Sequence, residues 1–198
     1  MLSRYRFQAL IAAAGLVVIA AALVLYGMMS GSVHGGGATP PAVLADLKPV
    51  APAKTVPAVA FSAADGSRHM LSEFKGRYVL LNLWATWCAP CVKELPALAA
   101  LQKAVSKDQL IVVPVNVGRS DAKKTGQFLK KHGAGSLPVY NDTNIALVRA
   151  FRAYGLPASI LIDPQGREIA RAMGPAEWDA PAAITYFKNL PLAPKPAS

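Results

Sequence analysis

The sequence predicts a single α/β domain built around one sheet and preceded by a membrane-spanning helix. At 198 residues the chain is long enough for one core of ordinary size with an appendage, and too short for two large cores. Strand-like and helix-like segments alternate from Pro57 onward, which is typical of helices packed on a sheet. The uncharged run from Leu10 to Met29 has the length that a helix needs to cross a bilayer, about 20 residues.

The N-terminal segment is expected to anchor the protein in a membrane. Arg4 and Arg6 precede the apolar run, and no further Lys or Arg occurs before Lys48. The positive-inside rule therefore keeps residues 1–9 in the cytoplasm, makes residues 10–29 the single-pass anchor and exports the rest. A cleaved signal peptide is the alternative, although the run is longer than the usual apolar core of a signal peptide.

The segment between the anchor and the domain is expected to be a flexible tether. Residues 30–56 are rich in Gly, Ala and Pro and show no sustained apolar periodicity. The domain is predicted to span residues 57–190, and residues 191–198 are predicted to form a disordered tail. The formal net charge is +10, but the basic residues are scattered and lack interleaved aromatic side chains, so nucleic acid is not an expected partner.

Each element of the domain is predicted from its own local pattern. Asp65 and Gly66 form a hairpin turn between the first two strands. The third strand is apolar on both faces apart from Asn82, as a central strand covered on both sides would be. An amphipathic helix ends at Gly133, and the sequence PQG joins the last two strands in a second hairpin. The predicted elements are, in order, strands Ala58–Phe61, Arg68–Leu71 and Tyr78–Trp84, helix Ala89–Val105, strand Leu110–Asn116, helix Asp121–His132, a short strand near Val139, helix Asn144–Ala153, strands Ser159–Asp163 and Glu168–Met173, and helix Asp179–Asn189.

The cysteines of the chain, Cys88 and Cys91, lie where the predicted buried strand meets the following helix. If Cys88 is the N-cap, Pro90 falls in the first turn, where its missing N–H costs little, and the N–H of Cys91 points at the Cys88 sulfur. The helix dipole and this hydrogen bond both favour a thiolate. We therefore predict that Cys88 is the nucleophile and that Cys91, on the same helix face, resolves a mixed disulfide.

Other uses of a cysteine pair fit the sequence less well. A permanent structural disulfide across so short a loop would remove little chain entropy from the unfolded state. A zinc site would need two more ligands, and the remaining candidates are three dispersed histidines. Attachment of haem would need a histidine directly after the second cysteine, where Val92 stands. No metal or cofactor is expected.

Longer motifs surround the cysteines. They lie within LLNLWATWCAPCVKELPAL, from Leu80 to Leu98, with LSEFKGR upstream and with GLPASILIDPQGREIA and GPAEW downstream. Together these motifs resemble the TlpA/ResA branch of the membrane-anchored thioredoxin-family disulfide reductases, and TlpA most closely, over nearly all of residues 58–190. The resemblance implies a thioredoxin-like fold, with a central mixed sheet flanked by helices and an N-terminal β-hairpin extension.

The resemblance also implies a role in cytochrome biogenesis. Members of this branch are thiol:disulfide oxidoreductases that reduce cysteines of apocytochrome c or of copper-site proteins in oxidase assembly. A membrane electron donor of the thiol-reducing pathway then reduces the cysteine pair again. Protein disulfides, that donor and the bacterial inner membrane are therefore the expected partners, and the resemblance implies a periplasmic catalytic domain.

Several further residues acquire roles from the resemblance. Pro157 matches a cis-proline that faces the cysteines and leaves the backbone of Leu156 free to pair with a substrate strand. Glu94 matches an acidic residue that tunes the thiols and could accept the proton of Cys91, although a solvated helix glutamate is the alternative. Trp87 and Pro90 are assigned to the surface that contacts substrate. Asn82 replaces the buried acid of thioredoxins proper, so a hydrogen-bonding role is expected for it.

The sequence favours a disulfide reductase and leaves two rival functions open. A dithiol oxidase would use the same residues and differ only in reduction potential. A copper-binding chaperone would use both thiolates as soft ligands, but it would need a third ligand that the sequence does not provide convincingly.

Overall fold

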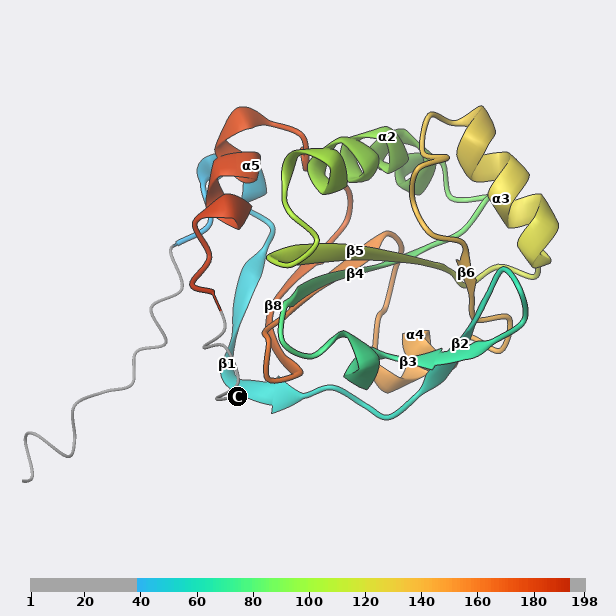
Figure 1. Cartoon of the computed structure of the whole chain (residues 1–198), viewed down its shortest axis with the longest axis horizontal. Helices are drawn as coiled ribbons and strands as arrows, with labels where there is room; N and C mark the ends of the chain where they lie inside the picture. The colour runs from blue at the N-terminus through green and yellow to red at the C-terminus, as the bar shows by residue number, and fades with distance from the viewer. Residues whose placement is uncertain (1–38, 193–198) are drawn as a thin grey trace, which may run out of the picture. The chain divides into compact units, whose positions relative to one another are not determined.

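The computed structural model describes residues 39–192 of the chain, shown in colour in Figure 1. The strands are β1 (Lys48–Thr55), β2 (Ala60–Ala63), β3 (Arg68–Met70), β4 (Tyr78–Trp84), β5 (Leu110–Asn116), β6 (Tyr140–Asn141), β7 (Ala158–Ile162) and β8 (Arg167–Met173). The helices are α2 (Ala89–Ala104), α3 (Ala122–Lys131), α4 (Ala146–Ala150) and α5 (Pro181–Lys188), with 3-10 turns η1 (Ala42–Leu44) and η2 (Leu71–Phe74).

The strands form one mixed sheet. It has eight strands in the order β1-β8-β7-β4-β5-β6-β2-β3. Strands β4, β5 and β6 run parallel to one another, and the other neighbours pair antiparallel. Helices α2 and α5 lie on one side of the sheet and α4 lies on the other (Figure 1). The predicted thioredoxin-like α/β fold is therefore confirmed, including the hairpin of β2 and β3.

The central strand β4 is buried on both faces, as its sequence predicts. Leu80 and Trp84 belong to the core cluster that includes side chains of α2 and α5. Leu81 and Leu83 belong to the cluster on the opposite face, which includes side chains of α4. Because successive side chains of a strand point to opposite faces, an uninterrupted apolar run fits a strand with helices on both sides.

The unit β4–α2–β5 determines where the cysteines lie. Strands β4 and β5 pair in parallel register from Tyr78 with Leu110 to Trp84 with Asn116. Parallel neighbours need a crossover connection, and α2 provides it. The N-terminus of α2 therefore lies just beyond the carboxyl end of a fully buried strand.

Helix α4 is shorter than the predicted helix Asn144–Ala153. It covers Ala146–Ala150 and is bracketed by two left-handed residues, Ile145 with φ 50° and Arg152 with φ 51°. Left-handed backbone interrupts a right-handed helix, so the predicted bounds were wrong at both ends.

The tether predicted over residues 30–56 was wrong for its second half. Leu44 and Leu47 are buried in the main core cluster, and η1 contacts α5. Strand β1 pairs antiparallel with β8 at the edge of the sheet. An edge strand tolerates proline and exposes most of its side chains, so the Pro- and Ala-rich sequence of β1 gives little local signal. The folded domain therefore begins near residue 42 rather than at residue 57.

The described part of the chain, residues 39–192, contains no helix that is long and apolar enough to cross a membrane. The predicted cytoplasmic segment 1–9, the predicted anchor 10–29 and residues 193–198 of the predicted tail lie outside this part.

The burial of Leu47 predicts a stability effect that a tether residue would not have. We expect Leu47→Ala to lower the free energy of unfolding by about 2 to 4 kcal/mol, because it removes a buried side chain from the core. Leu192→Ala is the matched control, since Leu192 is 72% exposed, and it should change the value by less than about 0.5 kcal/mol. Urea unfolding of both variants measures the difference. Equal stabilities would contradict the assignment of this segment to the domain.

Candidate active site

The two cysteines are joined in a disulfide at the start of α2. Cys88 is the N-cap residue, with extended backbone angles, and its Sγ accepts a hydrogen bond from the N–H of Cys91 at 3.3 Å. Pro90 lies in the first turn and is exposed. The local geometry expected from the spacing of the cysteines is therefore present.

The two sulfur-bearing residues differ in access. Cys88 is 6% exposed, whereas Cys91 is fully buried at 0%. Trp87, directly before Cys88, is 73% exposed. A protein thiol or disulfide that approaches this site can therefore reach Cys88, while Cys91 can act only on Cys88.

Glu94 is a buried carboxylate one turn after Cys91. Its Oε1 accepts a hydrogen bond from Nδ2 of Asn82 at 2.7 Å. Its Oε2 accepts hydrogen bonds from Nε1 of Trp178 at 3.0 Å and from the backbone N–H of Ala176 at 3.2 Å. Since only 4% of Glu94 is exposed, the alternative of a solvated helix glutamate is wrong.

Burial governs the protonation of Glu94. Desolvation raises the pKa of its carboxyl from 4.5 to about 7, and the hydrogen bonds from Trp178, Asn82 and Ala176 oppose this rise only in part. The carboxyl therefore changes its protonation state near neutral pH. Side chains three residues apart lie about 5 to 6 Å apart at their Cβ atoms on one helix face, so Glu94 is placed to exchange a proton with Cys91 directly or through water.

Asn82 connects this carboxylate to the neighbouring strand. Its Nδ2 donates to Oε1 of Glu94 and, at 2.9 Å, to Oγ of Ser159 in β7. Its Oδ1 is buried and has no hydrogen-bond partner within residues 39–192. The amide thus offers donors to the ionised carboxylate, and its free oxygen is an acceptor for the O–H of the protonated acid if the amide turns over.

Trp178 and Ala176 were not predicted to take part in the site. They lie in the GPAEW motif between β8 and α5, and Trp178 is fully buried. The motif was visible in the sequence as part of the resemblance, but nothing local indicated that its indole faces Glu94, 84 positions away in the chain.

Pro157 and Leu156 lie at the same end of the sheet as the cysteines. Strand β7 runs antiparallel to β4, with Ala158 opposite Leu83, so the residues just before β7 lie beside the turn after β4. The peptide bond between Leu156 and Pro157 is cis, as the resemblance implies. Within residues 39–192, no hydrogen bond uses the backbone N–H or C=O of Leu156, so both groups are available to an added strand.

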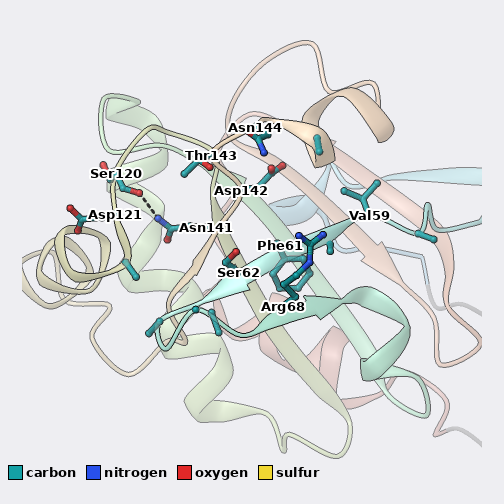
Figure 2. A pocket seen from close by; sticks show the side chains of 17 residues that line it. Val59, Phe61, Ser62, Arg68, Ser120, Asp121, Asn141, Asp142, Thr143 and Asn144 are labelled. Atoms are coloured by element: carbon teal, nitrogen blue, oxygen red, sulfur yellow. Dashed lines mark hydrogen bonds between the residues drawn. The ribbon is translucent and has the colours of Figure 1, made fainter.

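Two cavities lie on the surface near α4. The first, of about 540 Å³, is lined by the β2–β3 hairpin, the start of α3 and the loop before α4, and it excludes both cysteines (Figure 2). The second, of about 500 Å³, includes Trp87 in its wall. The described residues contain no cluster of three or more His, Cys, Asp or Glu side chains that could hold a metal ion.

Comparison with known proteins gives consistent matches to redox proteins. The family model described as Redoxin matches residues 51–186. The thiol-disulfide oxidoreductase ResA of Bacillus subtilis (strain 168) is 34% identical over 133 residues, which cover 67% of this chain and 73% of the relative. The ResA protein of Geobacillus thermodenitrificans is 31% identical over 118 residues, covering 60% of this chain and 67% of the relative.

Solved structures agree with the sequence relatives. A thioredoxin-family thiol:disulfide interchange protein from Chlorobium tepidum matches with a TM-score of 0.56 and 26% identity, over 70% of this chain and 99% of that chain. The exposed lipoprotein thioredoxin Etrx1 of Streptococcus pneumoniae matches with a TM-score of 0.54 and 27% identity, over 62% of this chain and 93% of that chain.

The raised pKa of Glu94 predicts a pH dependence of stability in the oxidised protein. The folded state holds this proton more tightly than the unfolded state, so the stabilisation is complete below pH 4.5 and is lost as the pH rises through about 7. The shift corresponds to roughly 3 kcal/mol. We expect Glu94→Gln to remove most of this decline, as measured by urea unfolding from pH 4.5 to 8.5.

The matched control for this variant is Glu177→Gln. Glu177 is exposed and lies in the loop that also carries Ala176 and Trp178. Its variant should follow the pH profile of the wild type. Parallel profiles for Glu94→Gln and the wild type between pH 4.5 and 7 would refute the titration of Glu94.

Proposed function

The chain belongs to the Redoxin family and is a ResA-like thiol-disulfide oxidoreductase, and from this premise we propose that it works as a disulfide reductase on the periplasmic face of a bacterial inner membrane. The observation that carries the proposal is the pairing of an accessible N-cap sulfur on Cys88 with a buried carboxyl, Glu94, one turn beyond the inaccessible Cys91. Reduction of a client requires Cys91 to lose a proton, and Glu94 is a suitable acceptor near neutral pH.

The first step is attack by the reduced protein on its client. The thiolate of Cys88 attacks one sulfur of the client disulfide, a mixed disulfide forms, and the other client sulfur leaves as a thiolate. The N–H of Cys91 and the positive end of the α2 dipole favour the thiolate of Cys88. The free N–H and C=O of Leu156 can hold the client backbone as an added strand during this step.

The second step releases the client. Cys91 gives its proton to Glu94, directly or through water, and the resulting thiolate attacks the sulfur of Cys88. The second client sulfur leaves as a thiolate, which takes up a proton. The client has gained two electrons, and Cys88 and Cys91 form the disulfide seen in the structure.

The proposed location keeps the active site near membrane-bound clients. The uncharged run at residues 10–29, preceded by Arg4 and Arg6, supports a single-pass anchor with an exported domain. Because the domain begins near residue 42, the proposed tether shortens to about residues 30–41. A flexible chain of that length has a typical end-to-end distance of roughly 20 Å, which holds the site close to the membrane and raises the effective concentration of membrane-bound clients.

We propose apocytochrome c or copper-site proteins of cytochrome oxidase as clients, and a membrane thiol-reducing protein as the electron donor. The motifs shared with the TlpA/ResA branch support this choice. No cofactor enters the cycle, since the electrons pass only between sulfur atoms.

The decisive experiment removes the resolving thiol. We expect Cys91→Ala to accumulate mixed disulfides on Cys88, because nothing then releases the client, and mass spectrometry of the trapped complexes should identify envelope proteins with paired cysteines. Cys88→Ala is the matched control and should trap nothing, since Cys91 is buried. Absence of envelope clients among the trapped proteins would contradict the proposal.

The redox state of the wild-type cysteine pair in cells distinguishes a reductase from an oxidase. Thiol trapping of the wild-type protein should find Cys88 and Cys91 mostly reduced if the protein is a reductase. A mostly oxidised pair would instead support a dithiol oxidase.

A further inference from the structure

We propose that the cavity beside Trp87 binds the client segment that flanks the attacked cysteine, and that it selects a segment with a large apolar side chain and a carboxylate. We call this cavity the Trp87 groove. The inference rests on the proposed function as an exchange enzyme and adds to it the chemistry of the client sequence. The groove is lined by Trp87, Val117, Gly118, Arg119, Thr143, Asn144 and Ile145.

The position of the groove is the first reason for this proposal. Trp87 forms part of its wall and directly precedes the accessible Cys88. The groove therefore begins at the residue next to the sulfur that a client must reach. A polypeptide joined to Cys88 through its own cysteine would have its neighbouring residues within reach of the groove.

The apolar wall is the second reason. Ile145 is 41% exposed and has φ 50°, in the left-handed region that β-branched residues rarely adopt. Neither burial nor backbone preference accounts for isoleucine here, whereas strained residues cluster at binding sites. Together with the exposed indole of Trp87, Ile145 offers two large apolar surfaces within one cavity.

Gly118 contributes to the lining of the groove. A Cβ at this position would lie 3.0 Å from Oδ1 of Asn116 and 3.7 Å from Nε1 of Trp87. The same Asn116 oxygen accepts the N–H of Gly118 at 2.9 Å, so the main chain is held in place at this position. A side chain at position 118 would therefore crowd the Asn116 amide, and glycine lets the main chain lie beside the indole of Trp87 in the lining of the groove.

The charge of the groove is the third reason. Arg119 is exposed and has no hydrogen bond or ion pair from its side chain to any residue of the described range 39–192. No Asp or Glu lines the groove. Two acidic residues close to it in the sequence already have partners. Asp121 caps α3 and pairs with Lys124, and Asp142 accepts the N–H of Leu147. An acidic client side chain would complement this surface.

The shape around the groove favours an extended chain over a small molecule. Thr143 and Asn144 also line the larger cavity of Figure 2, so the two hollows adjoin. The far cavity carries Arg68, whose side chain likewise has no ion pair among residues 39–192. An extended segment could therefore leave the cysteines through the Trp87 groove and continue toward Arg68.

The test measures the rate at which the reduced protein attacks a set of short peptides. Each peptide carries one cysteine as a mixed disulfide with the neutral thiol 2-hydroxyethanethiol, flanked by Leu and by either Asp, Asn or Lys. We expect the Asp peptide to react about threefold faster than the Asn peptide and the Lys peptide to react more slowly, as for a single exposed charge pair. High salt should reduce the preference.

A charge reversal assigns the preference to one residue. Arg119→Glu should invert the order of the Asp and Lys peptides. Lys103→Glu makes the same change of charge in the last turn of α2, roughly 20 Å along the helix from Cys88, and should leave the order unchanged. An unchanged preference for Asp in Arg119→Glu would overturn the proposal, as would a similar loss in Lys103→Glu.

A second variant tests the apolar wall without weakening the fold. Asparagine adopts left-handed backbone more readily than isoleucine, so Ile145→Asn should raise the Tm by a few degrees. The same variant should lose the preference for a Leu peptide over a Ser peptide. A preference for Leu equal to that of the wild type would overturn the role of Ile145.

Reduction of the bis(2-hydroxyethyl) disulfide separates this inference from the proposed function. This neutral molecule has no flanking sequence, so its rate measures the intrinsic exchange activity of each variant, and the peptide rates of that variant are compared after division by it. Failure of the wild-type protein with this disulfide would count against the proposed exchange activity itself. Normal rates with it, together with no discrimination among peptides, would overturn the groove alone.

Discussion

The active site depends on a constraint of chain geometry: strands that pair in parallel cannot be joined by a tight turn. Since β4 and β5 are parallel neighbours, α2 must begin just past the carboxyl end of β4. The residue at this junction therefore lies next to an unpaired backbone N–H of the helix and next to the positive end of the helix dipole. Cys88 occupies that position, so the N–H of Cys91 and the helix dipole are directed at its sulfur, and the fully buried strand β4 fixes the junction in place.

The pKa of the Glu94 carboxyl is set by two opposing effects, burial and hydrogen bonding. Its hydrogen-bond donors come from α2's neighbours in the fold, namely Asn82 on β4 and the backbone of Ala176 and indole of Trp178 after β8. Burial outweighs these three hydrogen bonds, and the pKa settles at about 7. With much stronger hydrogen bonds the group would be a permanent anion, and with none it would stay a neutral acid. Only the intermediate case provides a proton acceptor that can be reset at neutral pH.

The sequence predicted the features that have local causes. Alternating elements and the apolar run of β4 indicated the fold, and the spacing of Cys88 and Cys91 after a strand indicated the N-cap geometry. The missed features depend on distant partners. Strand β1 is stabilised by pairing with β8, far along the chain, while its own residues are mostly exposed and include prolines. Trp178 contacts Glu94 across 84 positions, and no local pattern encodes such a pairing.

The corrected start of the domain connects its first residues to the surroundings of Glu94. Leu44, Leu47 and Trp178 belong to the same buried cluster, and η1 contacts α5, the helix that follows Trp178. Ala176 and η1 also line one surface hollow, so the turn lies next to the loop that donates to Glu94. A domain cut at residue 57 would retain both cysteines yet lose part of the packing behind these donors. Residues 42–56 are therefore part of the folded domain, and they pack behind the loop whose Ala176 and Trp178 donate to Glu94.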